Sequence, residues 1–202
     1  MLSFKPFLRL NPGVETLLKE YVDQITDPTL RDLAYIPLND PRFWKSPAAA
    51  KKHHAYPGGL SVHTLQVLEL TLRMLEVFAN PRVNETVVAL IWHDYAKIWD
   101  YREVTDLDVD ARKKGDSYIY TDHAGKIGHL PRSYGEMLSA AKALQVPEET
   151  IDFIGHLMLA HHGRKEWNSP VLPAETEAWC IHAADMISAQ YSTDAHIPPN
   201  KR

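Results

Sequence analysis

The sequence predicts an all-α fold, and two features of its patterning carry that prediction. Apolar residues recur at intervals of three and four over several long segments, which is the period of an amphipathic helix. No group of neighbouring segments alternates apolar and polar residues as half-buried strands do. The 202 residues, of which 45 % are hydrophobic, suffice for one domain with its own core, so we treat 1–202 as a single domain.

Residues 1–50 predict a helical extension that precedes the core of the domain, which we place at 51–192. Asp27 and Pro28 are typical of the N-cap and first position of a short second helix. The segment 37–50 is rich in proline and predicts irregular structure. The first helix is indicated by apolar residues at helical spacing: Val14, Leu17, Leu18, Tyr21, Val22 and Ile25.

The core is expected to open with a long helix over 61–79, after a turn marked by Gly58 and Gly59. We expect Asn84 to cap the next helix, which runs into the sequence Trp-His-Asp at 92–94. The buried stripe of the long helix is predicted to consist of Leu65, Leu68, Leu72 and Leu75.

The rest of the core is expected to contain three more helices after a less helical segment at 100–126. Within that segment a charged run precedes Tyr-Ile-Tyr at 118–120, which favours a short hairpin. Prolines and acidic residues at helix starts predict helices over 131–144 and 147–160. The last helix is expected over 175–191.

Charge and cysteine content exclude some functional classes. The formal net charge is −4 with neutral histidines, whereas proteins that coat nucleic acids are strongly basic. No apolar run approaches the roughly 18 residues that cross a bilayer, so we expect no membrane partner. Cys180 is the single cysteine, so no intramolecular disulfide forms, which suits a reducing, cytoplasmic location.

Histidine is the unusual component, at 11 of 202 residues. Neutral imidazole is a common metal ligand, although a single histidine near a helix end is more often a cap or a core hydrogen-bonding group. Adjacent His-Asp pairs also arise by chance. What favours a metal site is an ordered set with one member on each expected helix or helix end: His63, the pair His93 and Asp94, His129, the pair His161 and His162, and Asp185.

This ordered set resembles the HD-domain metal-dependent phosphohydrolases. Within that superfamily the similarity is greatest to the HD domain of YhaM-type 3′–5′ exoribonucleases, and it covers roughly residues 20–192. The sequence departs from the family at Ala96, where the family often has glycine. The resemblance is carried by five segments: HHAYPGGLSVHT (53–64), HDYAK (93–97), IGHL (127–130), HLMLAHHGRKEWNSPVLP (156–173) and EAWCIHAADMISA (177–189).

The resemblance implies a helical bundle around a binuclear metal centre. By that resemblance Asp94 bridges two divalent transition-metal ions, with His129 and His161 on the second ion. Such ligands suit Mn, Fe, Co, Ni or Zn, and the ions lower the pKa of bound water so that hydroxide is available. The implied ligands of the first ion are His63, His93, Asp94 and Asp185.

Other residues near these motifs receive roles that stay open. Asp94 and Lys97 are the expected catalytic pair, and the resemblance favours Lys97 as the cation that contacts the scissile phosphate. His162 is expected to contact substrate, although a metal ligand or a helix cap remains an alternative. Arg164 is a candidate phosphate contact, with a solvated loop as the alternative. Trp167 is the tryptophan most suited to stacking on a base.

The sequence thus predicts an enzyme, a phosphodiesterase that cleaves a phosphoester of a nucleotide or short oligonucleotide. The resembling exoribonucleases also carry an N-terminal OB-type domain, for which this sequence shows no counterpart. We therefore expect a small phosphoester, a nucleotide or a short single strand as substrate. Two alternatives remain, a di-iron oxygenase of the HD type and a non-catalytic HD-like signalling module.

Overall fold

The computed structural model describes residues 13–51 and 54–191, and the all-α class is confirmed within them. A 3₁₀ turn at Lys165–Trp167 and two short strands, β1 (Tyr101–Glu103) and β2 (Tyr118–Tyr120), accompany the helices. The helices are α1 (Val14–Asp23), α2 (Pro28–Leu38), α3 (Gly59–Leu75), α4 (Val83–Trp92), α5 (Lys97–Asp100), α6 (Val109–Lys113), α7 (Asp122–Lys126), α8 (His129–Ala143), α9 (Glu148–Ala160) and α10 (Thr176–Tyr191).

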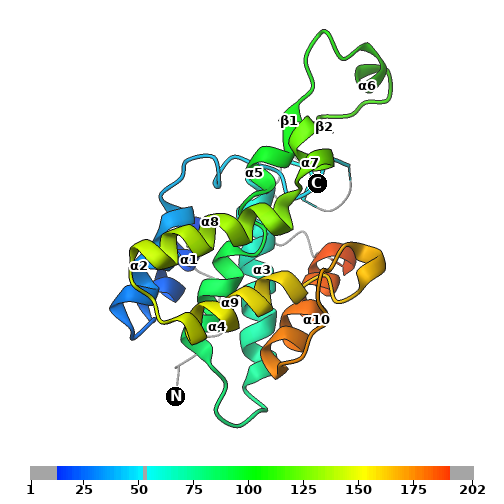
Figure 1. Ribbon diagram of the computed structural model, residues 1–202. Coiled ribbons are helices and arrows are strands. Elements are labelled where there is room, and N and C mark those ends of the chain that lie inside the picture. Colours follow the sequence, from blue (N-terminus) through cyan, green and yellow to red (C-terminus); the bar gives the residue numbers. More distant parts are fainter. Residues whose placement is uncertain (1–12, 52–53, 192–202) are drawn as a thin grey trace.

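Helices α3 and α4 form the centre of the bundle, as Figure 1 shows. Helix α10 packs along α3, while α2 and α9 pack against α4 and α8 packs on α9. The interior between them is apolar, so the site residues project from helices fixed by a common core. Fully buried side chains of that core include Leu65, Leu68, Leu90, Ile91 and Trp92.

Asp27 caps α2 as predicted, because its carboxylate accepts hydrogen bonds from the amides of Thr29 and Leu30 at 2.8 and 3.1 Å. Asn84 does not cap α4, because the helix begins at Val83 and Asn84 lies inside its first turn. The Asn84 side chain instead donates to Thr26 Oγ1 at 2.8 Å and so ties α4 to the α1–α2 connection. A partner distant in sequence therefore overrode the local capping preference.

Helix α3 begins at Gly59, two residues before the predicted start, and ends at Leu75 instead of continuing to 79. Gly58 adopts a positive φ of 82°, and a Cβ on Gly59 would lie 2.0 Å from the carbonyl oxygen of His54. The two glycines thus allow a tight turn that runs directly into the helix. Helix α8 likewise begins at His129, because Pro131 is tolerated within a first helical turn.

The predicted hairpin is present and pairs β1 with β2 in antiparallel register, with Tyr101 opposite Tyr120. It projects from the bundle together with α6, as the upper part of Figure 1 shows. The short helices α6 and α7 were not predicted, because five-residue helices give too little periodic signal. Within the described ranges, no helix combines the length and the apolar character that a membrane span requires.

Candidate metal centre

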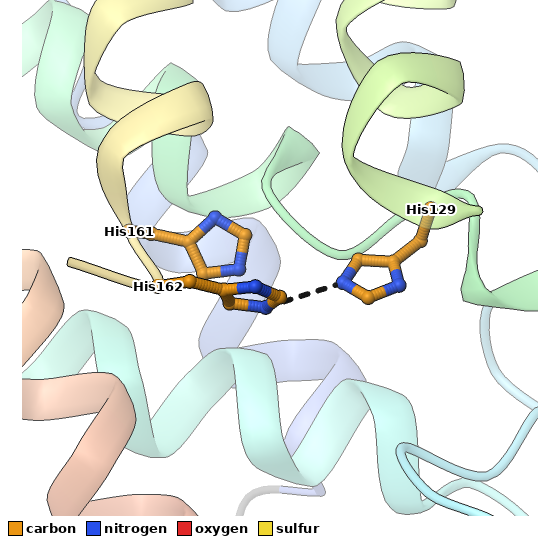
Figure 2. A group of neighbouring side chains, drawn as sticks. All are labelled: His129, His161 and His162. Atoms are coloured by element: carbon orange, nitrogen blue, oxygen red, sulfur yellow. Dashed lines mark hydrogen bonds between the residues drawn. The ribbon is translucent and has the colours of Figure 1, made fainter. Parts of the chain in front are cut away.

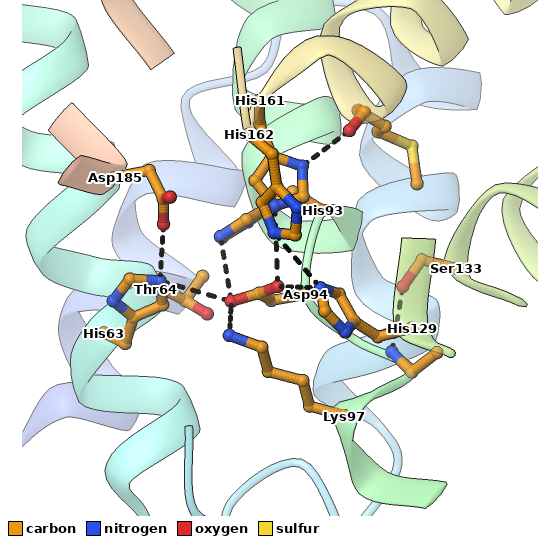
Figure 3. Close-up of polar contacts among 12 residues, drawn as sticks. His63, Thr64, His93, Asp94, Lys97, His129, Ser133, His161, His162 and Asp185 are labelled. Carbon is orange, nitrogen blue, oxygen red and sulfur yellow. Dashed lines mark hydrogen bonds and ion pairs between the residues drawn. The ribbon is translucent and has the colours of Figure 1, made fainter. Parts of the chain in front are cut away.

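Asp94 lies at the centre of the predicted site, just after α4 ends, and its two oxygens face different histidines (Figure 3). Oδ2 lies 3.2 Å from His63 Nε2 and 3.4 Å from His93 Nε2. Oδ1 lies 3.5 Å from His129 Nε2 and 3.7 Å from His161 Nε2. One carboxylate therefore stands between two pairs of imidazoles.

The first group of candidate ligands combines residues of α3 and α10 with the turn that follows α4. The ligand atoms of His63, His93, Asp94 and Asp185 all lie within 4.8 Å of one another. His63 Nε2 is 3.0 Å from Asp185 Oδ1, across the α3–α10 contact. The bundle thus brings together four residues that are spread over 123 positions of sequence, from 63 to 185.

The second group contains His129, His161 and His162, whose ligand atoms also lie within 4.8 Å of one another. His129 begins α8, and the two adjacent histidines follow the end of α9. Figure 2 shows the ring of His162 turned toward His129, with 3.3 Å between their Nε2 atoms. The structure therefore brings His162 into the cluster with the two predicted ligands.

Hydrogen bonds on the outer side of three rings fix which nitrogen faces the centre. A carbonyl oxygen can only accept, so each Nδ1 bonded to one carries the proton and leaves the Nε2 lone pair directed inward. This is the arrangement in which histidine ligates a metal. The three contacts are His93 Nδ1 to Leu90 O at 2.7 Å, His161 Nδ1 to Met158 O at 2.6 Å, and His162 Nδ1 to Trp167 O at 2.7 Å.

Several of the inward atoms lack hydrogen-bond partners among the described residues. They are buried, and they include His93 Nε2, His161 Nε2 and Asp94 Oδ1. Buried polar atoms are rarely left without a partner, so a group of them around one point calls for a bound species. Neutral imidazole nitrogens with two carboxylates are donors that suit divalent transition-metal ions, and the residues present fit such ions.

The electrostatics of the cluster favour the ligating protonation states of most members. Burial, and then the neighbouring His162, lowers the pKa of His161 well below its usual value. Burial and the nearby His129 lower the pKa of His162 to about 4, so both rings are neutral at neutral pH. Burial raises the pKa of Asp94, but Lys97 and then His93 outweigh it and hold the carboxyl ionised.

His63 behaves differently from these rings. Burial lowers its pKa, but hydrogen bonds to Asp185 and Asp94 outweigh burial and raise the pKa above the usual value. The same contact with His63 outweighs the effect of burial on Asp185 and lowers the pKa of that carboxyl. His63 Nδ1 lies 2.9 Å from Ser188 Oγ, which itself donates to Gln66 Oε1, so the serine accepts from the imidazole.

Sequence reasoning missed two residues that adjoin the cluster. Asp100, 3 % exposed, accepts from His129 Nδ1 at 3.0 Å through one oxygen and from His123 Nδ1 at 2.8 Å through the other. Both residues lie in the 100–126 segment, whose charged composition resembles a solvated loop. No spacing in the sequence distinguishes Asp100 from the other acidic residues there.

The two predicted phosphate contacts occupy different places. Lys97 is buried beside the cluster, and its ammonium lies 2.5 Å from Asp94 Oδ2. Arg164 is exposed, and its guanidinium lies over the indole of Trp167 at 4.8 Å from the ring centroid. The structure thus brings Lys97 into the cluster and leaves Arg164 on the loop that follows the two adjacent histidines.

Comparisons with known proteins find similarity over most of the chain. The family model described as the HD domain matches residues 60–190. The 3′–5′ exoribonuclease YhaM of Shouchella clausii is 28 % identical over 175 residues, which is 86 % of this chain and 51 % of the relative. The protein of the same name from Oceanobacillus iheyensis is 29 % identical over 177 residues, 86 % of this chain and 52 % of the relative.

The Bacillus subtilis protein of that name is 26 % identical over 175 residues, covering 86 % of this chain and 52 % of its own length. The chain therefore spans about half the length of the curated relatives it matches. No solved structure matches the chain.

Proposed function

Because the chain belongs to the HD-domain family and is therefore a metal-dependent hydrolase, we propose that it cleaves a phosphodiester bond of a nucleotide or short oligonucleotide. The family resemblance drawn from the ordered motifs is thereby confirmed. The observation that carries the proposal is the position of Asp94, whose two oxygens face two separate groups of histidines. Relatives named as exoribonucleases support a phosphodiester as the bond that is cleaved.

We assign the first of two ions to His63, His93, Asp94 and Asp185, as the family resemblance implied. The second ion is assigned to His129 and His161, with Asp94 as the shared ligand. The distances of 3.5 and 3.7 Å from Asp94 Oδ1 to these two rings support the assignment, because they exceed hydrogen-bonding distance and leave both ring nitrogens directed at one oxygen.

His162 is the residue for which the structure favours the alternative that the sequence left open. Its Nδ1 donates to a carbonyl, its Nε2 lies 3.3 Å from His129 Nε2, and its lowered pKa keeps the ring neutral. We therefore propose His162 as a third histidine of the second ion. His162→Ala should then lower the content of one ion as His161→Ala does, whereas a pure substrate contact would leave metal content unchanged.

The remaining site residues would bind and orient the substrate. When bound, two divalent ions would supply a water of lowered pKa and positive charge for the phosphate oxygens. Lys97 adds a buried cation at the shared carboxylate, which places positive charge where a scissile phosphate would approach. Arg164 stands further out and suits a neighbouring phosphate of the same strand.

The chain is proposed to be one HD domain over 1–202, with an extension at 1–50 and a core at 51–192. A cytoplasmic location is part of the proposal and is supported by the free thiol of Cys180. Nothing in residues 13–51 and 54–191 favours a di-iron oxygenase or a non-catalytic signalling module over a hydrolase.

Metal analysis combined with a substrate panel tests this function. Protein purified without chelator and reconstituted with Mn²⁺ should contain close to two ions per chain. It should hydrolyse an aryl phosphodiester and a dinucleotide faster than the corresponding monoesters. Dioxygen consumption by the iron form, without diesterase activity in any metal form, would assign the site to an oxygenase instead. One ion per chain, remote from His129 and His161, would contradict the binuclear assignment.

A further inference from the structure

We propose that Trp167 and Arg164 form a stacking platform for a nucleobase of the substrate, beside the metal centre. This inference rests on the proposed phosphodiesterase function and names the part of the substrate that the site would recognise. Trp167 lies in the 3₁₀ turn after the two adjacent histidines, and 40 % of its surface is exposed. Arg164 lies over the indole and the ring of His182 lies 6.1 Å from it, so a base would stack on the part of the ring that these two side chains leave exposed.

The indole is coupled to the cluster through its own backbone. The carbonyl oxygen of Trp167 accepts the hydrogen bond from His162 Nδ1 at 2.7 Å, and the opposite nitrogen of that ring faces His129 at 3.3 Å. One imidazole therefore separates the Trp167 backbone from the proposed second ion. On this side of the site, a base would be joined through its sugar to a phosphate held at the ions.

Backbone and side-chain hydrogen bonds brace the loop that carries Trp167. The amides of Trp167 and Ser169 both donate to the carbonyl of Arg164, each at 3.0 Å. Ser169 is 2 % exposed, and its hydroxyl contacts the carbonyls of Leu159 and Val171 at 2.9 and 2.7 Å. These contacts pre-order the loop, so a ligand that stacks on the indole would not bear the entropy cost of ordering it.

The two side chains of the platform offer the chemistry that a nucleotide needs. The guanidinium of Arg164 lies 4.8 Å from the indole centroid, and both planar groups stack on bases. Because Arg164 also carries a positive charge, the same pair can contact a phosphate of the strand. The platform would contact the flat face of a base, and all four bases have such a face. We therefore expect little preference for one base over another.

Trp179 provides a matched control elsewhere on the surface. It is 56 % exposed on α10, and it lines an apolar groove of about 690 Å³ with residues such as Leu70 and Phe78. Among the described contacts its indole approaches His182, and none of them joins it to His129, His161 or His162. The ring of His182 also lies 6.1 Å from that of Trp167, so Trp179→Leu tests whether losing an exposed indole beside His182 changes binding while the platform residues themselves are kept.

The experiment measures equilibrium binding of adenosine 5′-monophosphate and ribose 5-phosphate to the metal-loaded protein by calorimetry. Base stacking is worth about 1–3 kcal/mol, so the wild type should prefer the nucleotide by roughly 5- to 150-fold. Trp167→Leu should remove most of this preference while keeping the backbone carbonyl, and Trp167→Phe should retain much of it. Trp179→Leu should bind as the wild type does.

Arg164→Lys keeps the charge and removes the planar group, so it should lower the preference by less than Trp167→Leu. Equal affinity of the wild type for both ligands would overturn the platform. Equal weakening of both ligands by Trp167→Leu would overturn it too, because Trp167 would then act through His162. The binding measurement decides these outcomes even if the protein hydrolyses no diester, a result that would refute the proposed function alone.

Discussion

Asp100 accepts a hydrogen bond from Nδ1 of His129 at 3.0 Å, and this contact orients a proposed ligand through a residue outside the ligand set. Because a carboxylate accepts at both oxygens, the same residue also fixes His123, at 2.8 Å. Donation from Nδ1 leaves the Nε2 lone pair of His129 directed at Asp94. Asp100 is therefore a positioning residue for the second ion.

Asp100→Asn should lower the affinity for the second ion by about 10- to 100-fold, which is the usual effect of replacing a residue that orients a ligating histidine. The affinity for the first ion should change much less. The amide cannot accept at both positions and carries no charge. Titration of the metal-free protein with Zn²⁺ or Mn²⁺ would resolve the two affinities. Asp122→Asn is a suitable control, because Asp122 is exposed and its described ion pair is with Lys126 on the surface. Equal weakening of both ions would show that Asp100 supports the fold instead.

Asp94→Ala should remove both ions and abolish turnover, since Asp94 is the carboxylate that faces all four of His63, His93, His129 and His161. Elemental analysis after reconstitution would measure the loss. The variant also leaves the Lys97 ammonium without its carboxylate, so Asp94→Ala with Lys97→Met separates that effect. Retention of one ion at wild-type affinity would contradict the shared role of Asp94.

The candidate ligands were predictable from the sequence because the order of the whole set along the chain, and not any single motif, resembles a known family. His63, the His93-Asp94 pair and Asp185 are brought together as that order implied. Asp100 was not predictable, since its partner His129 lies 29 positions away and nothing local marks it. Asn84 shows the same limit in the fold, because its contact with Thr26 comes from helix packing and not from local preference.

Gly163 follows the two adjacent histidines and has a φ of 74°, a conformation that favours glycine. A Cβ there would lie 2.3 Å from Cε1 of His182, whose Nδ1 donates to the His161 carbonyl at 2.9 Å. Gly163→Ala should therefore destabilise the protein by about 1–3 kcal/mol and lower metal content. Chemical denaturation and elemental analysis would measure both effects.

Gly135→Ala is the matched control for this glycine. Gly135 lies within α8, and a Cβ there would meet nothing within 4 Å, so the alanine should stabilise the protein by about 0.5–1 kcal/mol. Adding His182→Ala to Gly163→Ala removes the steric contact but not the backbone strain, so stability should return only in part. Full tolerance of Gly163→Ala would contradict the described turn.

Asp40 connects the segment after α2 to Tyr95 of the HDYAK motif, whose hydroxyl donates to Asp40 Oδ2 at 2.8 Å. Burial raises the pKa of Asp40, but hydrogen bonds from Arg42 and Tyr95 outweigh it and hold the pKa below the ordinary value of 3.8. A carboxyl whose pKa is lowered by folding contributes stability above its unfolded pKa and loses that contribution as the pH falls through its folded pKa.

Asp40→Asn should therefore lower the free energy of unfolding by about 1 kcal/mol near pH 6, a modest figure because Arg42 is half exposed and screened by solvent. The difference from the wild type should shrink as the pH falls below 3.8. Urea denaturation across that range would measure it. If the difference in unfolding free energy stayed the same at acid pH, packing and not the charge of Asp40 would account for it. Asp106→Asn, at an exposed ion pair, should change stability little.

Acidic neighbours neutralise many of the basic side chains on the surface, which bears on the length of substrate the protein can hold. Such cations would have to give up their carboxylates before they could contact phosphates. Described pairs with N–O distances of 2.6 to 2.9 Å are Lys19–Glu15, Arg42–Asp40, Lys51–Asp116, Arg82–Glu85, Arg102–Asp108, Arg112–Asp106, Lys126–Asp122 and Arg132–Glu136.

Long RNA should therefore gain little affinity over a short strand. If about two or three phosphates are neutralised, the logarithm of affinity should fall with the logarithm of salt concentration at a slope of about −1.4 to −2.1 for a single strand. Turnover of a dinucleotide and a labelled 30-mer with Mn²⁺, over a range of salt concentrations, would measure this slope through KM. We expect KM values within about tenfold of each other and release of the 30-mer between cleavage events, because the few contacts near the ions are shared by both substrates. The contrary outcome is a slope steeper than about −3.5, which corresponds to five or more phosphates, together with processive degradation of the 30-mer. It would show that the paired cations leave their carboxylates and bind RNA.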